Sequence, residues 1–255
     1  MRVWLVIGAG AVLLAAALAI EAPATLLDRR VAELTDGRVH VGAATGTLWR
    51  GSGEVTLLPD GVRIPIAWHL EATSLLHGGL TGSLVAADAN RPATFSVGPE
   101  NFSVRDFAIT LPAAAVLRTA GLPGGLTDAG GTLALDVTNL ARSGDQLEAR
   151  ADVDWKDAAL PTSMTGTRIA LGEVRITVGG SGAEIPATLS NAGGEVDIAG
   201  TLVFSTRGTP KIDARIKPRS GLPPERAKAI TAVLSGIGRG DGAGAYRIAW
   251  PLAVR

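Results

Sequence analysis

The sequence has few of the residues on which most nucleophilic and metal chemistry depends. Its 255 residues include no cysteine and only three histidines, which stand apart at positions 40, 69 and 77. The lack of cysteine excludes disulfides, a thiol nucleophile and cysteine-ligated metals, and scattered histidines supply no ligand set. A phosphate loop with its lysine, a serine nucleophile elbow, an HExxH helix and an EF-hand loop are also missing. We therefore predict no enzymatic activity, no metal and no cofactor.

Net charge and aromatic content are low as well. The 24 basic and 24 acidic residues give a formal net charge of +0, so no overall field attracts nucleic acid. Aromatic residues make up 4% of the chain, whereas 33 glycines and 14 prolines indicate many turns. A hydrophobic content of 46% is enough for one large β-rich unit or two smaller domains with a core.

The N-terminus carries the longest apolar run. Val3–Ile20 comprises 18 residues without a charge, which would be about 27 Å long as a helix and close to the thickness of a bilayer core. Because Arg2 and the amino group precede it, the positive-inside rule predicts a single-pass anchor with a cytoplasmic N-terminus and Trp4 at the interface. The alternative is a signal peptide cleaved after Ala17-Leu18-Ala19 or Ala22-Pro23-Ala24. Either interpretation exports the bulk of the chain.

Beyond the anchor, residues 21–36 are predicted to contain a short amphipathic helix, and residues 37–255 form a β-rich domain. The clearest alternation of apolar and polar residues lies at Val62–Glu71 and Leu147–Lys156. The charged residues at 148–156 carry both signs along one face, as on the solvated face of a sheet. Further strands are predicted at 39–41, 55–58, 80–87, 93–97, 102–110, 133–137, 168–171, 173–178, 184–189, 194–205, 210–218 and 246–252.

The spacing of these strands predicts a mainly β fold. We expect a transmembrane helix followed by a large curved antiparallel sheet, open or half-barrel-like, with two short helices at 111–119 and 222–235. The strand pattern restarts after a glycine-proline cluster at 121–125. This restart is compatible with two related halves, 37–125 and 126–255.

A tryptophan between glycines marks the start of the strand pattern. In Gly46–Gly53, the glycines permit a tight corner that aims Trp49 into a core, and the alternative is an exposed ligand platform. We favour the first interpretation, in which Trp49 is a structural residue of the core. We expect four core indoles in the chain, with a set of motif residues around the first of them. The indoles are Trp49, Trp68, Trp155 and Trp250, and the motif residues are Gly46, Leu48 and Gly51.

The order of these motifs resembles the type II secretion system protein N family of Gram-negative bacteria. The resemblance rests on Gly46–Gly51, the Trp68 strand with Leu75–Leu80, the Leu111-Pro112 helix, the Trp155 strand, and a proline-led helix before a closing Tyr246–Leu252 strand. It implies a bitopic inner-membrane protein with a two-residue cytoplasmic tail, a periplasmic β-rich domain and other secretion subunits of the inner-membrane platform as partners. No enzymatic residues come with this resemblance.

Two functions from different classes follow. In the first, the periplasmic domain is an accessory scaffold whose strand edges or polar faces meet other secretion subunits, for instance by strand addition. In the second, the chain is an AsmA-like envelope protein that binds or transfers lipid in an apolar groove of a curved sheet.

Overall fold

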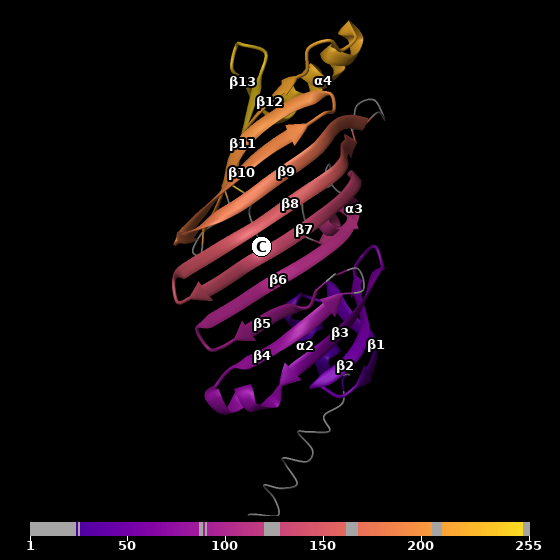
Figure 1. Cartoon of the computed structure of the whole chain (residues 1–255). Helices are drawn as coiled ribbons and strands as arrows, with labels where there is room; N and C mark the ends of the chain where they lie inside the picture. The colour runs from indigo at the N-terminus through magenta and orange to yellow at the C-terminus, as the bar shows by residue number, and fades with distance from the viewer. Residues whose placement is uncertain are drawn as a thin grey trace, which may run out of the picture. The chain divides into compact units, whose positions relative to one another are not determined.

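The computed structural model describes residues 24, 26–86, 89, 91–119, 128–161, 168–205 and 211–251. These residues divide into two compact units, unit 1 up to Pro99 and unit 2 from Glu100 (Figure 1). They contain fourteen strands, and every described pairing is antiparallel, so the predicted mainly β antiparallel fold with few helices is confirmed. The proposed relation between halves that meet at 125/126 stays a prediction.

The predicted anchor at 3–20, with Arg2 and Trp4, lies outside the described residues. Within the described ranges, no helix is both long enough and apolar enough to cross a membrane. The transmembrane segment therefore stays a prediction of the sequence.

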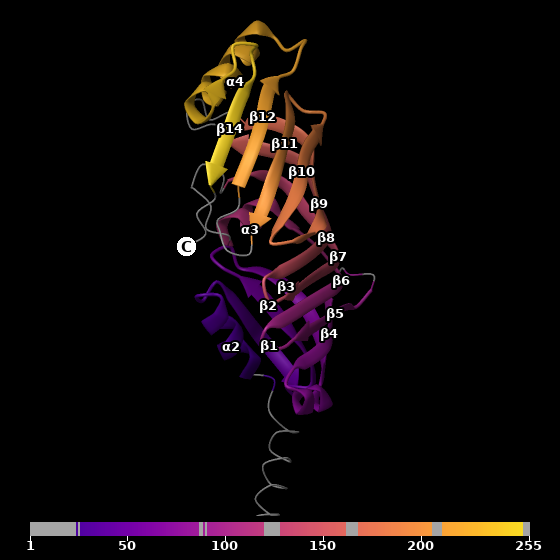
Figure 2. The same cartoon turned by 90° about the vertical axis from the view of Figure 1, so that its left-hand side faces the viewer.

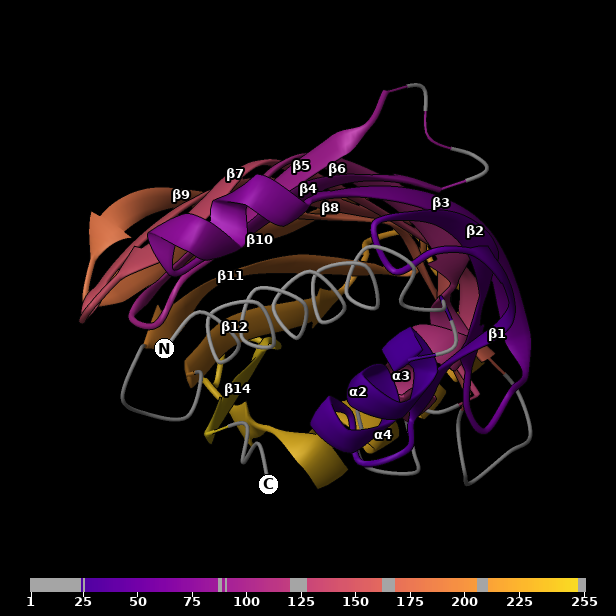
Figure 3. The same cartoon turned by 90° about the horizontal axis from the view of Figure 1, so that it is seen from below.

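Unit 1 is an antiparallel meander that follows a short helix, and its strands lie in the sheet in sequence order. The helix α2 lies beside the first strand (Figure 3). The elements of unit 1 are α2 (Leu26–Leu34), β1 (Val39–Gly46), β2 (Arg50–Leu57), β3 (Val62–Glu71), the short 3-10 helix η1 (Ala72–His77), β4 (Leu80–Ala86) and β5 (Ala93–Val97).

Strand β3 has the bounds that the alternation predicts, and it buries Trp68 and Leu70 on its apolar face. Pro65 predicts an edge or a bulge, because proline cannot donate to the ladder. The strand is an interior one between β2 and β4, but its described pairing with β4 begins at Ile66, which is paired with Ala86. The proline thus sits just beyond the ladder that would need its N–H group.

Unit 2 continues the antiparallel pattern, with β13 joined to the outer side of β14. The helix α4 packs beside β12 and β14 (Figure 2). The elements of unit 2 are β6 (Asn101–Pro112), α3 (Ala113–Thr119), β7 (Gly130–Ser143), β8 (Gln146–Pro161), β9 (Arg168–Gly182), β10 (Glu184–Ala192), β11 (Val196–Ser205), β12 (Lys211–Pro218), α4 (Pro224–Ile237), β13 (Arg239–Gly240) and β14 (Tyr246–Pro251).

The main buried cluster of unit 2 forms where α4 covers the apolar side of the sheet. Ile230 and Leu234 of the helix pack against Val174, Val196 and Ile198 of β9 and β11. Ile230 and Val196 are almost completely shielded from solvent. Burial of these aliphatic side chains, at about 1.5–3 kcal/mol each, is the main force that holds α4 on the sheet.

Strand β9 departs from the sequence prediction, which places two strands at 168–171 and 173–178. The structure has one strand that passes through Gly172 with a φ of +80°, opposite a register irregularity at Ala158 of β8. A Cβ atom at Gly172 would lie 2.2 Å from the carbonyl oxygen of Ala192. The glycine therefore permits a bulge and a close approach of β10 without ending the strand.

Candidate interaction surfaces

The motif residues of unit 1 converge on one indole. The Nε1–H group of Trp68, which is 6% exposed, donates to the carbonyl oxygen of Leu48 at 3.0 Å. A Cβ atom at Gly51 would lie 2.5 Å from Cζ2 of that indole, and Gly46 adopts a φ of +88° beside Arg50. Both glycines are needed for the corner that covers the Trp68 ring.

The other tryptophans lie in different surroundings. Trp49 is half-buried and packs against the same cluster as Trp68. Trp155, also half-buried, donates its Nε1–H group to Gly130 O at 2.8 Å and packs against the unit 2 core. Trp250 belongs to β14 through its backbone pairing with Ile212, while its side chain lies outside the described set.

His40 and His69 take part in separate local contacts. The Nδ1 atom of His40 is 3.3 Å from Asp28 Oδ1, whereas Nδ1 of His69 accepts a hydrogen bond from Arg50 Nε at 3.1 Å. Among the residues that the structure describes, histidine and carboxylate side chains form no group of three that could hold a metal.

The outer face of unit 2 carries rows of charged side chains that pair across strands. Asp154 of β8 accepts from Arg175 of β9 at 2.5 Å, and Asp213 of β12 accepts from Arg247 of β14 at 2.7 Å. The hydrogen bond from Arg247 lowers the pKa of Asp213. Both carboxylates pair with guanidinium groups of a neighbouring strand, which suits a solvated sheet face.

One ion pair ties the start of α4 to the strands beneath it. The Glu195 carboxylate accepts from Arg226 Nε at 2.5 Å and Nη2 at 2.6 Å, and also from the N–H group of Ala170 at 2.9 Å. Arg226 donates further to Arg168 O. The hydrogen bond from Arg226 is the largest cause that lowers the pKa of Glu195. Charge-assisted bonds of this kind fix the helix against β9.

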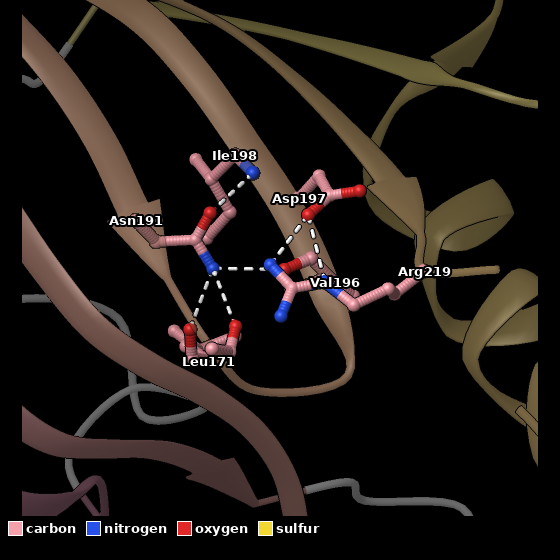
Figure 4. Close-up of polar contacts among 7 residues, drawn as sticks. Leu171, Asn191, Val196, Asp197, Ile198 and Arg219 are labelled. Carbon is pink, nitrogen blue, oxygen red and sulfur yellow. Dashed lines mark hydrogen bonds and ion pairs between the residues drawn. The ribbon is translucent and has the colours of Figure 1, made fainter. Parts of the chain in front are cut away.

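A polar side chain on the apolar side of unit 2 closes the β10–β11 turn (Figure 4). The Asn191 amide donates from Nδ2 to Leu171 O at 2.6 Å and to Val196 O at 2.8 Å, and Oδ1 accepts from Ile198 N at 2.7 Å. Both the donor and the acceptor ends of this amide are used inside the fold. Asn191 therefore serves the turn and is not a candidate ligand contact.

The outer edge of β1 is closed by side chains from α2 and the turn after it. The N–H group of Val41 donates to Asp28 Oδ1 at 2.8 Å, and the N–H group of Val39 donates to Thr35 Oγ1 at 3.2 Å. An unpaired row of backbone groups is the feature that another strand would recognise. In this half of β1, side chains of the chain itself already satisfy those N–H groups.

The outer edge of β14 is different. The N–H group of Asp241 donates to Ala245 O at 2.9 Å, so Ala245 directs its backbone groups toward the β13 side. Because backbone groups alternate sides along a strand, Arg247 and Ala249 direct their N–H and C=O groups to the same side, and Pro251 directs its C=O group there. Strand β13 has only two residues, and its pairing with β14 ends at Arg247. Within the described residues, no strand pairs with β14 beyond that point on this side.

Taken together, these features describe an antiparallel β protein whose accessible elements are strand edges, charged strand faces and exposed loops. The chain belongs to the family of type II secretion system protein N, because the model of that family matches residues 37–249, which span most of both units. The match confirms the resemblance found in the sequence and identifies a component of the type II secretion system. No curated protein and no solved structure matches the chain.

Proposed function

We propose that the chain is a non-enzymatic inner-membrane component of the type II secretion machinery. In this proposal, residues 3–20 span the inner membrane with the N-terminus in the cytoplasm, and both β units lie in the periplasm. The family match and the charge-free run that follows Arg2 support this arrangement. The units then act as an accessory scaffold for other subunits of the inner-membrane platform.

The observation that carries the scaffold role is the outer edge of β14. The backbone N–H and C=O groups of Ala249 and the carbonyl group of Pro251 face outward past the end of β13, whereas Asp28 and Thr35 accept from the outward N–H groups of Val41 and Val39 on β1. A segment from another secretion subunit can extend the short β13 row along β14 by strand addition. The Arg247–Asp213 pair beside this edge offers polar contacts at its rim.

The test compares Ala249→Pro with Ala249→Val in the full chain. Because the N–H group of Ala249 faces away from β12, proline removes an outward donor and leaves the inner ladder intact, and proline is tolerated on edges. Valine keeps that donor on the exposed strand. We expect Ala249→Pro, but not Ala249→Val, to lose the other secretion subunits that copurify with the chain from crosslinked membranes.

The scaffold proposal is wrong if crosslinked membranes yield no secretion subunit with the unmodified chain, and if deletion of the gene leaves protein export intact. Equal recovery of subunits with Ala249→Pro and Ala249→Val would retain a scaffold but reject the β14 edge as its contact.

The anchor is tested separately by the intact mass of the protein purified from membranes. Retention of residues 1–24 supports the anchor. An N-terminus between Ala19 and Thr25 would show cleavage of a signal peptide and contradict the anchor.

A further inference from the structure

The link between β3 and β4 displays two leucines to solvent. Leu75 and Leu76, in the helical turn η1, are 53% and 86% exposed, and η1 buries none of its residues. Figure 1 shows this turn in purple between β3 and β4. Val97 pairs with Leu80, three residues after the end of η1, and is itself 49% exposed. We call Leu75, Leu76 and Val97 the apolar tip of unit 1.

The turn that carries the leucines is held by polar contacts on its inner side. Ser74 Oγ donates to Glu71 O and accepts from Thr81 N at 3.0 Å, and Thr81 Oγ1 donates to Glu71 Oε2 at 2.9 Å. Gly78 closes the turn in the left-handed conformation, with its N–H group donating to Leu75 O at 3.0 Å. The leucines are thus presented by a bonded turn, and adjacent apolar side chains held out in this way mark an interaction site.

The apolar tip lies close to the point where the chain leaves the predicted anchor. Ala24 is 2% exposed and belongs to the same buried cluster as Trp68 and Leu70, and Leu80 packs against that cluster. Leu70 and Leu80 flank η1 on its two sides. Ala24 follows Ile20 by four positions, a distance of at most about 14 Å when the chain is fully extended. Unit 1 is therefore tethered to the membrane surface at the cluster from which η1 projects.

We propose that the apolar tip inserts Leu75 and Leu76 into the periplasmic leaflet of the membrane, next to the anchor. This inference rests on the proposed anchor. Leucines are favoured on the lipid-facing side of interfacial segments, and burying them needs no directional partner. Leucine is also under-represented among the residues that dominate protein interfaces, where Trp, Tyr and Arg prevail. The chemistry of the tip and its tether both favour lipid over a protein partner.

The lack of cysteine allows a direct test in the full chain. Leu76→Cys gives one labelling site at a position where the side chain is exposed, so the label does not disturb the core. Arg63→Cys gives the matched control at the other end of β3, about 26 Å from Glu71, with a side chain that is also exposed. Each variant carries an environment-sensitive fluorophore and is reconstituted in vesicles of phospholipids with nitroxide-labelled acyl chains.

We expect the Leu76→Cys label to shift to shorter wavelength and to be strongly quenched by the nitroxide lipids, and the Arg63→Cys label to show neither effect. Equal emission and equal quenching at the two positions in membrane-retained protein would overturn the insertion of the tip and leave the anchor standing. Release of the whole chain from the vesicles by alkaline carbonate would overturn the anchor and the tip together.

Discussion

Both units cover one face of an antiparallel sheet, but they do so with different elements. Unit 1 covers Trp68 by a glycine-lined corner and leaves apolar side chains on its surface. Unit 2 covers its sheet with α4, ties the helix down with the Glu195–Arg226 pair, and presents charged rows on the outside. Among the described residues, the exposed large apolar side chains all belong to unit 1: Leu58, Leu75, Leu76, Val85 and Val97. This difference is the basis for proposing that unit 1 contacts lipid and unit 2 contacts other subunits.

The outer edges of β1 and β14 also differ between the two units. Asp28 and Thr35 occupy N–H groups of β1 in unit 1, whereas β14 in unit 2 has outward groups past the end of β13. Proteins usually protect edge strands against unwanted pairing, so an edge strand with outward backbone groups is a candidate for pairing with another chain. Pro251 limits how far an added strand can extend within the described residues.

The largest effect is expected from Trp68→Ala. Loss of a buried indole costs about 3–5 kcal/mol, and it also leaves the carbonyl oxygen of Leu48 without its donor. Hydrogen exchange of the full chain should show reduced protection in β2, β3 and β4, with the strands of unit 2 unchanged. The change in unfolding free energy is measured by urea denaturation followed by circular dichroism.

Trp68→Phe is the matched control, because it keeps an aromatic ring and removes only the N–H donor and one ring. It should lower the free energy of unfolding by about 1–2 kcal/mol. If Trp68→Ala reduces protection equally in β9–β11, the two units do not owe their stability to separate cores.

The next largest effect is expected from Ile230→Ala in α4. This side chain is fully buried against the unit 2 sheet, and such truncations cost about 2–5 kcal/mol. Protection should fall in α4, β9 and β11 and stay unchanged in β3. The matched control is Thr231→Ala, because Thr231 is exposed on the same helix and alanine favours helices, so no loss of stability is expected. Ala229→Gly is unsuitable, because glycine itself weakens helices. An unchanged denaturation midpoint for Ile230→Ala would show that α4 is not part of the core.

The smallest of the three effects concerns Glu195 and pH. The folded state lowers the pKa of Glu195 below its usual value of 4.5, mainly through the hydrogen bond from Arg226. The stabilisation is therefore complete above pH 4.5 and is lost as the pH falls through the lowered pKa. Glu195→Gln should cost about 1.5–3 kcal/mol at pH 7 and progressively less toward pH 3. Urea denaturation of both proteins at pH 7, 5 and 3 measures this difference.

The comparison of Glu195→Gln with Asp197→Asn separates the α4 contact from a general loss of carboxylates. Asp197 pairs with Arg219 on a more exposed surface, so Asp197→Asn should change stability little. A Glu195→Gln loss that is the same at pH 7 and pH 3 would contradict the role assigned to this carboxylate.

Much of the secondary structure follows from the sequence because apolar alternation and turn residues point to the same strands. β3 and β5 begin and end at the predicted residues, Val62–Glu71 and Ala93–Val97. The bounds of β9 differ from the prediction, because Gly172 inside a strand indicates a break as readily as a bulge. The structure shows a bulge, with the carbonyl group of Ala192 packed close to Gly172. The 3-10 helix η1 is not among the predicted elements, because no periodicity marks so short a helix.

The interaction surfaces are harder to predict than the strands. Asp28 accepts a hydrogen bond from the N–H group of Val41, which lies 13 residues further along the chain. The outward direction of the Ala249 backbone depends on the register set by the hydrogen bond between Asp241 and Ala245. Neither contact leaves a local pattern in the sequence. In the sequence, Leu75 and Leu76 belong only to a motif of the family resemblance, and the structure shows that both side chains are exposed. The lipid-groove alternative stays a prediction of the sequence.

The central claim is that another secretion subunit pairs with the outer edge of β14. A photo-crosslinking amino acid placed at Ala249 in the full chain, and at Thr188 on the exposed face of β10 as the control, tests it in membranes of the secreting cell. We predict a crosslink from position 249 to a subunit of the inner-membrane platform and none from position 188. No crosslink at 249, or equal crosslinks at both positions, would contradict the claim.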